Sequence, residues 1–221
     1  MRIFWVLGLL TFLLMGISQW FIWFYAPVER TLGLVQKIFY LHVPLAWWAF
    51  AAFFLVFAAS VLFLLRKKDK YDLLAGAAAE AGVVFSTMVL LTGMLWARAS
   101  WNVWWTWDPR LTTTLVMWFV YCGYLVLRNS GLAGERRKTI AAVVGIVAFL
   151  DVPLVFASAR MWRSIHPSVF VSEGGGLPLE MLITVLVSLV AWGAVLIWLC
   201  WLRYNQLKAA AKLDQVRGFD F

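Results

Sequence analysis

Long apolar runs separated by short polar connections make up almost the whole chain. A helix needs about 20 consecutive apolar residues to cross the hydrocarbon core of a membrane. Six runs meet or approach this length, and charged clusters bound the two shortest. The pattern predicts an all-α polytopic membrane protein whose residues 1–221 form a single domain of six transmembrane helices. The predicted spans are residues 3–25, 40–65, 73–96, 112–128, 139–157 and 179–202.

The composition supports a membrane protein and argues against a nucleic-acid partner. The 221 residues are 64% hydrophobic and 14% charged, with a mean hydropathy of +0.85. Soluble domains are about half apolar and a quarter charged. The net charge of +8 would suit an acidic partner. The basic residues flank the apolar runs, however, so membrane topology explains them better.

The distribution of lysine and arginine predicts the orientation of the chain in an inner (cytoplasmic) membrane. Thirteen of the 19 lysine and arginine residues lie at one end of the predicted spans, and six lie at the other. Because basic residues concentrate on the cytoplasmic side, both termini are expected there. The connections predicted to face outward are residues 26–39, 97–111 and 158–178.

The second outward connection contains the tryptophan-rich sequence WNVWWTWDPR. On an α-helix, Trp101, Trp104, Trp105 and Asp108 would share an arc of about 100°. In an extended segment, Trp105 and Trp107 would share a face instead. Tryptophan is common at membrane interfaces, so an aromatic belt and a site for a flat ligand are both open interpretations. The candidate ligand-binding residues of this segment are Trp101, Trp104, Trp105, Trp107, Asp108 and Arg110.

Two prolines predict helix starts near these candidates. Pro109 lies just before the fourth run, where a missing N–H costs little, and Asp108 is suited to cap that helix. A capping role is compatible with a place in a ligand site. Pro44 suits the first turn of the second helix, which puts His42 at an outward-facing helix entrance.

The two histidines of the chain, His42 and His166, both fall on the predicted outer side. A lone histidine in a membrane protein is usually a hydrogen-bonded packing residue, but a pair on one side suggests metal ligands. A zinc site would need further ligands. Cys122 and Cys200 lie inside apolar runs without a C-x-x-C motif, and no spacing of acidic residues defines such a site.

Haem suits these residues better than zinc does, because its iron needs only two axial protein ligands. The tryptophans would line the macrocycle, and arginines on the outer side would pair with its propionates. A charge that faces lipid headgroups is the simpler interpretation for any single arginine. The propionate candidates are Arg98, Arg110, Arg160 and Arg163.

Two acidic residues lie within apolar runs, where ionisable groups are functional candidates. Asp151 lies towards the outer end of the fifth run and can approach the site, whereas Glu80 lies nearer the cytoplasmic end and can snorkel. No P-loop, H-E-x-x-H or G-x-S-x-G motif is present. The sequence therefore predicts a binding protein rather than an enzyme of these classes.

The motifs together resemble a known family. WNVWWTWDPRLT is similar to the WWD signature of haem-handling proteins in cytochrome c biogenesis. FYLHVP and MWRSIHP resemble the two segments that hold the outer histidines of that family. Six spans in 221 residues resemble the CcmC family, over roughly residues 36–200. The other WWD proteins are longer and have more spans.

The resemblance implies haem binding and delivery in c-type cytochrome maturation. His42 and His166 would be the axial ligands of haem b. The segment from Trp101 to Asp108 would hold the macrocycle edge and meet a CcmE-like haem chaperone, whose covalent loading the protein would assist. The other implied partners are an ABC-type ATPase, its membrane subunit and a small single-span protein, which are CcmA-, CcmB- and CcmD-like. The sequence departs from the family pattern at the glycine-rich VSEGGG and at the charged Asp151.

Two alternatives belong to other functional classes. In the first, the chain is a transporter subunit whose outer aromatic groove binds another substrate or only a partner protein. In the second, it is a membrane metalloenzyme, which would need ligands beyond those that the sequence offers.

Overall fold

The computed structural model describes residues 2–130, 134–162 and 177–217, and these residues are almost entirely helical. Six helical stretches are long and apolar enough to cross a membrane, which confirms the predicted all-α architecture. These stretches are Ile3–Tyr25, Leu34–Arg66, Asp69–Trp101, Pro109–Arg128, Gly134–Ser158 and Leu179–Leu213.

The fifth span is divided into two helices, which the hydropathy pattern did not predict. Pro153 explains the division, because it has no N–H for the carbonyl of Phe149 and its ring would clash with that carbonyl. Phe149 and Leu150 form a turn at this point. The described elements are α1 (Arg2–Trp20), the π-helical turn η1 (Phe21–Tyr25), the 3₁₀ helix η2 (Leu34–Ile38), α2 (Phe39–Arg66), α3 (Asp69–Trp101), α4 (Pro109–Arg128), α5 (Gly134–Ala148), α6 (Asp151–Met161) and α7 (Leu179–Arg217).

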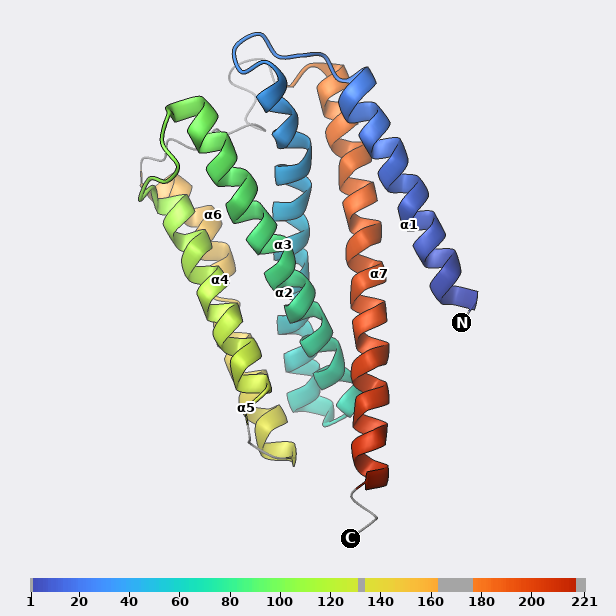
Figure 1. Ribbon diagram of the computed structural model, residues 1–221. Helices are drawn as coiled ribbons and strands as arrows, with labels where there is room; N and C mark the ends of the chain where they lie inside the picture. Colours follow the sequence, from blue (N-terminus) through green and yellow to red (C-terminus); the bar gives the residue numbers. More distant parts are fainter. Residues whose placement is uncertain (1, 131–133, 163–176, 218–221) are drawn as a thin grey trace.

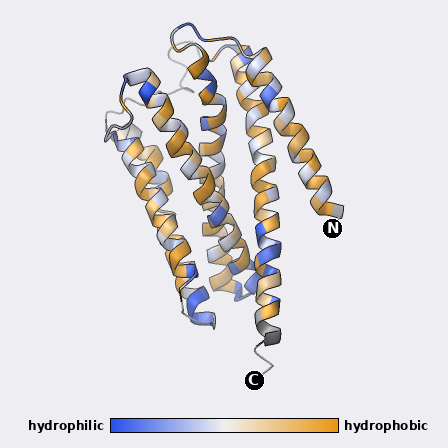
Figure 2. Ribbon diagram, in the orientation of Figure 1, coloured by the Kyte–Doolittle hydropathy of each residue, from blue (hydrophilic) through white to orange (hydrophobic). Residues whose placement is uncertain are grey.

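Helices α2 and α3 form an antiparallel hairpin at the centre of the bundle (Figure 1). Helix α7 packs on both of them and α1 packs on α7, while α4 and α6 pair on the other side of the hairpin. The connections that follow η1 and α3 lie at one end of the bundle, and the α2–α3 turn lies at the opposite end. Figure 2 shows hydrophilic residues gathered at the end that carries this turn.

Close packing in the core depends on small residues that let helices approach each other. Phe53 on α2 stacks on Tyr121 of α4, with ring centroids 3.6 Å apart and an interplanar angle of 13°. Gly82 on α3 lies against the same Phe53 ring, and a Cβ atom built on Gly82 would lie 2.5 Å from Phe53 Cε1. The stack therefore fills the space that a side chain at Gly82 would need.

Replacing Gly82 with alanine is expected to destabilise the bundle by about 1–3 kcal/mol, the usual cost of overpacking a core. The extra methyl group must displace the Phe53 ring from Tyr121. Thermal unfolding of the detergent-purified protein measures this effect. Gly123→Ala is the matched control, because nothing lies within 4 Å of a Cβ atom at Gly123. Equal melting temperatures for the two variants would contradict the prediction.

Charged side chains at the end with the α2–α3 turn form ion pairs between helices. Arg128 at the end of α4 binds Asp72 of α3 through two hydrogen bonds of 2.7 and 3.1 Å, and both side chains are buried. Arg203 of α7 binds Glu80, with 3.0 Å between Nη2 and Oε1. Glu80 is therefore paired with another helix, a partner that the sequence did not indicate.

Candidate haem site at the tryptophan-rich end of the bundle

The tryptophan-rich connection is a loop for most of its length. Helix α3 ends at Trp101, Asn102 has a left-handed backbone (φ 58°), and residues 102–108 are not helical. Of the two alternatives that the sequence left open, the helical arc does not occur, because no helix extends through these residues. Trp105 and Trp107 instead pack edge to face, with ring centroids 5.9 Å apart. This contact agrees with the extended alternative.

Asp108 ends this loop by capping helix α4. Its carboxylate accepts a hydrogen bond of 2.9 Å from the backbone N–H of Arg110, and Pro109 occupies the first turn. The Asp108 carbonyl accepts the N–H of Thr112 at 2.9 Å. The predicted capping role is confirmed. The cap holds Arg110, a propionate candidate, at a defined position in the first turn of α4.

Arg98 holds the opposite side of the loop. Its Nη1 atom donates to the carbonyl oxygen of Asn102 at 2.7 Å and to its side-chain oxygen, and the guanidinium lies 5.9 Å from the Trp104 ring centroid. Arg98 therefore fixes the turn that leaves α3. Of the other propionate candidates, the Arg160 side chain and Arg163 lie outside the described residues.

The loop divides its side chains between a buried and an exposed set. Trp104 and Trp107 are 54% and 75% exposed. Trp105 Nε1 and Thr106 Oγ1, in contrast, are buried and have no hydrogen-bond partner in the described part of the chain. A buried donor without an acceptor is costly. An anionic oxygen beside either group would satisfy it, which is compatible with a haem propionate.

His42 lies in the first turn of α2 and is half-buried against α3. Its Nδ1 atom lies 2.9 Å from Thr92 Oγ1. Thr92 precedes Trp101 by nine residues, so His42 lies about 14 Å deeper along the helix axis than the start of the loop. Pro44 lies beyond the first turn, contrary to the prediction, because η2 continues into α2 and that helix begins at Phe39.

The connection before α2 is ordered by Glu29 and Lys37, neither of which the sequence singled out as a structural residue. The Glu29 carboxylate accepts the N–H groups of Leu32 and Thr31, which lowers the pKa of Glu29. Lys37 is 5% exposed and its ammonium group donates to carbonyls of η1, including that of Trp23 at 3.2 Å. A π-helical turn leaves such carbonyls without their usual partners, so Lys37 caps it. No sequence motif indicated this contact.

Two further predictions concern residues near α6. His166 lies outside the described residues, so its predicted position beside His42 stays a prediction. Asp151 begins α6, and its Oδ2 atom is buried without a hydrogen-bond partner among the described residues.

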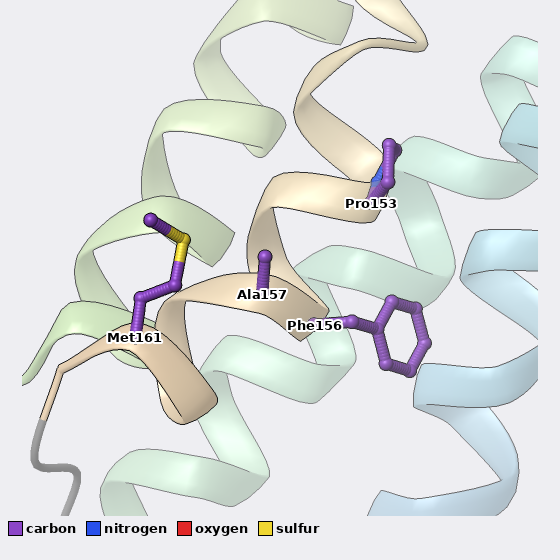
Figure 3. A pocket seen from close by; sticks show the side chains of 4 residues that line it. All are labelled: Pro153, Phe156, Ala157 and Met161. Atoms are coloured by element: carbon purple, nitrogen blue, oxygen red, sulfur yellow. The ribbon is translucent and has the colours of Figure 1, made fainter.

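An apolar cavity of about 380 Å³ lies along the same helix (Figure 3). It contains none of the candidate haem residues, and its lining is Pro153, Phe156, Ala157 and Met161.

Comparison with known proteins identifies the family. The family model described as Heme exporter protein C matches residues 1–217. The chain is 27% identical over 213 residues to Heme exporter protein C of Haemophilus influenzae, covering 95% of this chain and 87% of that protein. It is 33% identical over 169 residues to the Bradyrhizobium diazoefficiens protein of that name (76% and 64% covered). It is also 33% identical over 157 residues to that of Rhodobacter capsulatus (71% and 63%).

These matches differ in how much of each relative they cover. The chain spans slightly less than two thirds of the Bradyrhizobium and Rhodobacter proteins, but most of the Haemophilus protein. The family match includes both candidate histidines and the tryptophan-rich loop. Together with six apolar helices, it shows that this multi-pass membrane protein belongs to the CcmC, or Heme exporter protein C, family.

Proposed function

We propose that the protein binds haem b at the outer end of the bundle and delivers it for c-type cytochrome maturation. The observation that carries this proposal is the position of His42, whose imidazole is half-buried and hydrogen-bonded to α3 on the side of the tryptophan-rich loop. His42 and His166 would be the two axial ligands. Family membership supports the proposal, because the matching relatives are named as haem exporters.

The tryptophan-rich loop would hold the edge of the macrocycle. Trp105 Nε1 and Thr106 Oγ1 would bind a propionate, since both are buried without a partner among the described residues. Arg110, positioned by the Asp108 cap, would add a cation that pairs with a propionate. The exposed rings of Trp104 and Trp107 would remain available for a CcmE-like haem chaperone.

The proposed activity is binding and transfer, not bond-making by side chains. Iron supplies affinity through two imidazoles, while the protein orients the macrocycle and limits access of water. Transfer to the chaperone requires one histidine to release the iron. Stopped-flow spectra recorded during handover would reveal this ligand exchange, and a handover with no spectral intermediate or change in coordination would contradict it.

The membrane arrangement follows from the same proposal. The basic end of the bundle would face the cytoplasm and the haem site would face the outer side of the inner membrane. The whole chain would act as one domain. Its partners would be CcmA-, CcmB- and CcmD-like proteins, which would form an ABC-type complex with it.

The proposal is tested by titrating purified protein with haem and by complementing a strain that lacks c-type cytochrome maturation. Six-coordinate, low-spin haem and restored maturation are expected. A protein that stays free of haem, yet restores maturation, would favour the competing hypothesis of a transporter subunit. The exposed Trp104 and Trp107 would then form a surface for protein docking.

Replacing Trp105 with phenylalanine is expected to weaken haem binding by about 10-fold. The substitution keeps an aromatic ring but removes the buried N–H, and hydrogen bonds to charged groups are worth about 1.5–3 kcal/mol. Haem titration followed by absorption measures the change. Trp107→Phe is the control, because that ring is 75% exposed and is assigned no haem contact through its nitrogen. Equal affinities of the two variants would remove Trp105 from the propionate site.

A further inference from the structure

Thr92 contacts His42 in a way that determines the direction of their hydrogen bond. The Thr92 hydroxyl lies 2.7 Å from the carbonyl of Met88 and 3.2 Å from that of Val89 on its own helix. A hydroxyl has one hydrogen to donate and two lone pairs that accept. Since these carbonyls can only accept, the hydrogen of Thr92 points at them. The bond of 2.9 Å to His42 Nδ1 is then donated by the histidine ring.

The same helix contains a second threonine with this arrangement, where the donor is unambiguous. Thr87 Oγ1 donates to the carbonyl of Val83 at 2.7 Å and lies 2.8 Å from Trp118 Nε1. An indole nitrogen can only donate, so Thr87 accepts a ring N–H while it donates to its own helix. Thr92 has the same geometry towards His42.

A hydrogen on Nδ1 places the lone pair of the neutral imidazole on Nε2. Histidines that bind metals usually donate their other ring N–H to an acceptor, which fixes both the tautomer and the ring orientation. We infer that Thr92 is a positioning residue that sets His42 in the tautomer whose Nε2 atom binds haem iron. This inference rests on the proposed function of His42 as an axial ligand.

Gly93 contributes to the same contact. A Cβ atom built on Gly93 would lie 3.3 Å from His42 Cε1 and 3.9 Å from Nδ1. The imidazole therefore packs against backbone at Gly93, directly beside the hydroxyl that accepts its hydrogen. An added methyl group would push the ring away by a few tenths of an ångström, so α3 supplies both the acceptor and the space for His42.

The tautomer is measured directly in the haem-free protein by ¹⁵N NMR of labelled histidine. The chain has two histidines, and a His42→Gln sample assigns the signals. We expect a protonated Nδ1 and an unprotonated Nε2 in the wild type and in Thr92→Ser. Thr92→Val should shift His42 towards the Nε2–H form. A wild-type His42 that already carries Nε2–H, or a Thr92→Val spectrum like the wild type, would overturn the inference.

The effect of Thr92 on haem affinity and on the reduction potential of the haem is measured on the haem-loaded protein. Thr92→Val is expected to lower haem affinity about 10-fold, as is usual for the loss of an outer-shell partner. It should also raise the reduction potential, because an imidazole without an acceptor for its N–H donates less charge to iron. Thr92→Ser should restore both values. Unchanged affinity and potential in Thr92→Val would also overturn the inference.

Thr87→Val is the matched control, since it removes the same kind of hydroxyl from α3 but one that binds Trp118. It should leave the His42 tautomer and the haem potential unchanged; a change equal to that in Thr92→Val would identify a general effect on α3 and overturn the inference. The proposed function and the positioning role of Thr92 can be refuted separately. A Thr92-dependent tautomer in a protein that binds no haem would refute the proposed function alone, whereas haem bound through His42 without dependence on Thr92 would refute the positioning role alone.

Discussion

Replacing His42 with alanine is expected to abolish the six-coordinate, low-spin haem spectrum and to weaken haem binding by more than about 100-fold. Loss of an outer-shell partner already costs about 10–100-fold, and His42 is proposed to bind the iron itself. The ring lies against Gly93 and Thr92, so its removal leaves a space beside α3. Haem titration of the purified variant, followed by absorption spectra of both oxidation states, measures the effect.

Exogenous imidazole provides a test within the same variant. If His42 binds iron, imidazole should enter the vacated space and restore a low-spin spectrum to His42→Ala. Trp47→Phe is a control on the same helix, because this half-exposed residue packs on Phe156 of α6. A His42→Ala spectrum identical to that of the wild type would contradict the axial role and would make the loop a candidate for protein docking only.

The second large effect is expected at the opposite end of the bundle, where Arg128 binds Asp72. Replacing Arg128 with methionine should destabilise the protein by about 3–5 kcal/mol, because it leaves a buried carboxylate without its main partner. Arg128 also donates to the Asp72 carbonyl at 3.0 Å and to Tyr124. Arg137, at 3.5 Å from the carboxylate, replaces only part of this interaction. Unfolding in detergent measures the change in free energy.

Two further variants test whether the loss of stability comes from burial of the Arg128–Asp72 pair or from the loss of any charged side chain. The double variant Asp72→Asn, Arg128→Met should lose less stability than the sum of the single variants, since each single variant leaves one buried charge of the pair without its partner and the double variant removes both charges. Lys138→Met is the control, because its pair with Asp69 is 2.6 Å long but Asp69 is 57% exposed. Such surface pairs contribute about 0–1 kcal/mol. Equal losses for Arg128→Met and Lys138→Met would contradict the importance of burial.

The sequence predicted well those features that depend on local chemistry. The six spans follow from the lengths of the apolar runs, and the structure contains six corresponding stretches. The cap at Asp108 follows from an aspartate and a proline at adjacent positions, and its hydrogen bond to Arg110 is present. Both predictions succeed because the solvent preference of side chains and the needs of a helix end act within a few residues.

Predictions that depended on backbone direction were less successful. The tryptophan segment was compatible with a helical arc and with an extended chain, and the sequence did not decide between them. The structure ends the helix at Trp101, and the left-handed Asn102 begins the loop. The break of the fifth span at Phe149 was missed although Pro153 is visible in the sequence, because hydropathy does not report on a backbone hydrogen bond.

The sequence by itself determined the membrane class, the number of spans, the candidate histidines and the resemblance to haem-handling proteins. Only the tertiary structure decided which partners those residues have. Thr92 became relevant because α2 and α3 run antiparallel and place it beside His42, 50 positions away in the chain. Arg128, counted from the sequence as a topology signal, is a buried partner of Asp72. Hydrogen bonds and ion pairs require atoms within a few ångströms, and contacts between distant segments exist only after the helices have packed.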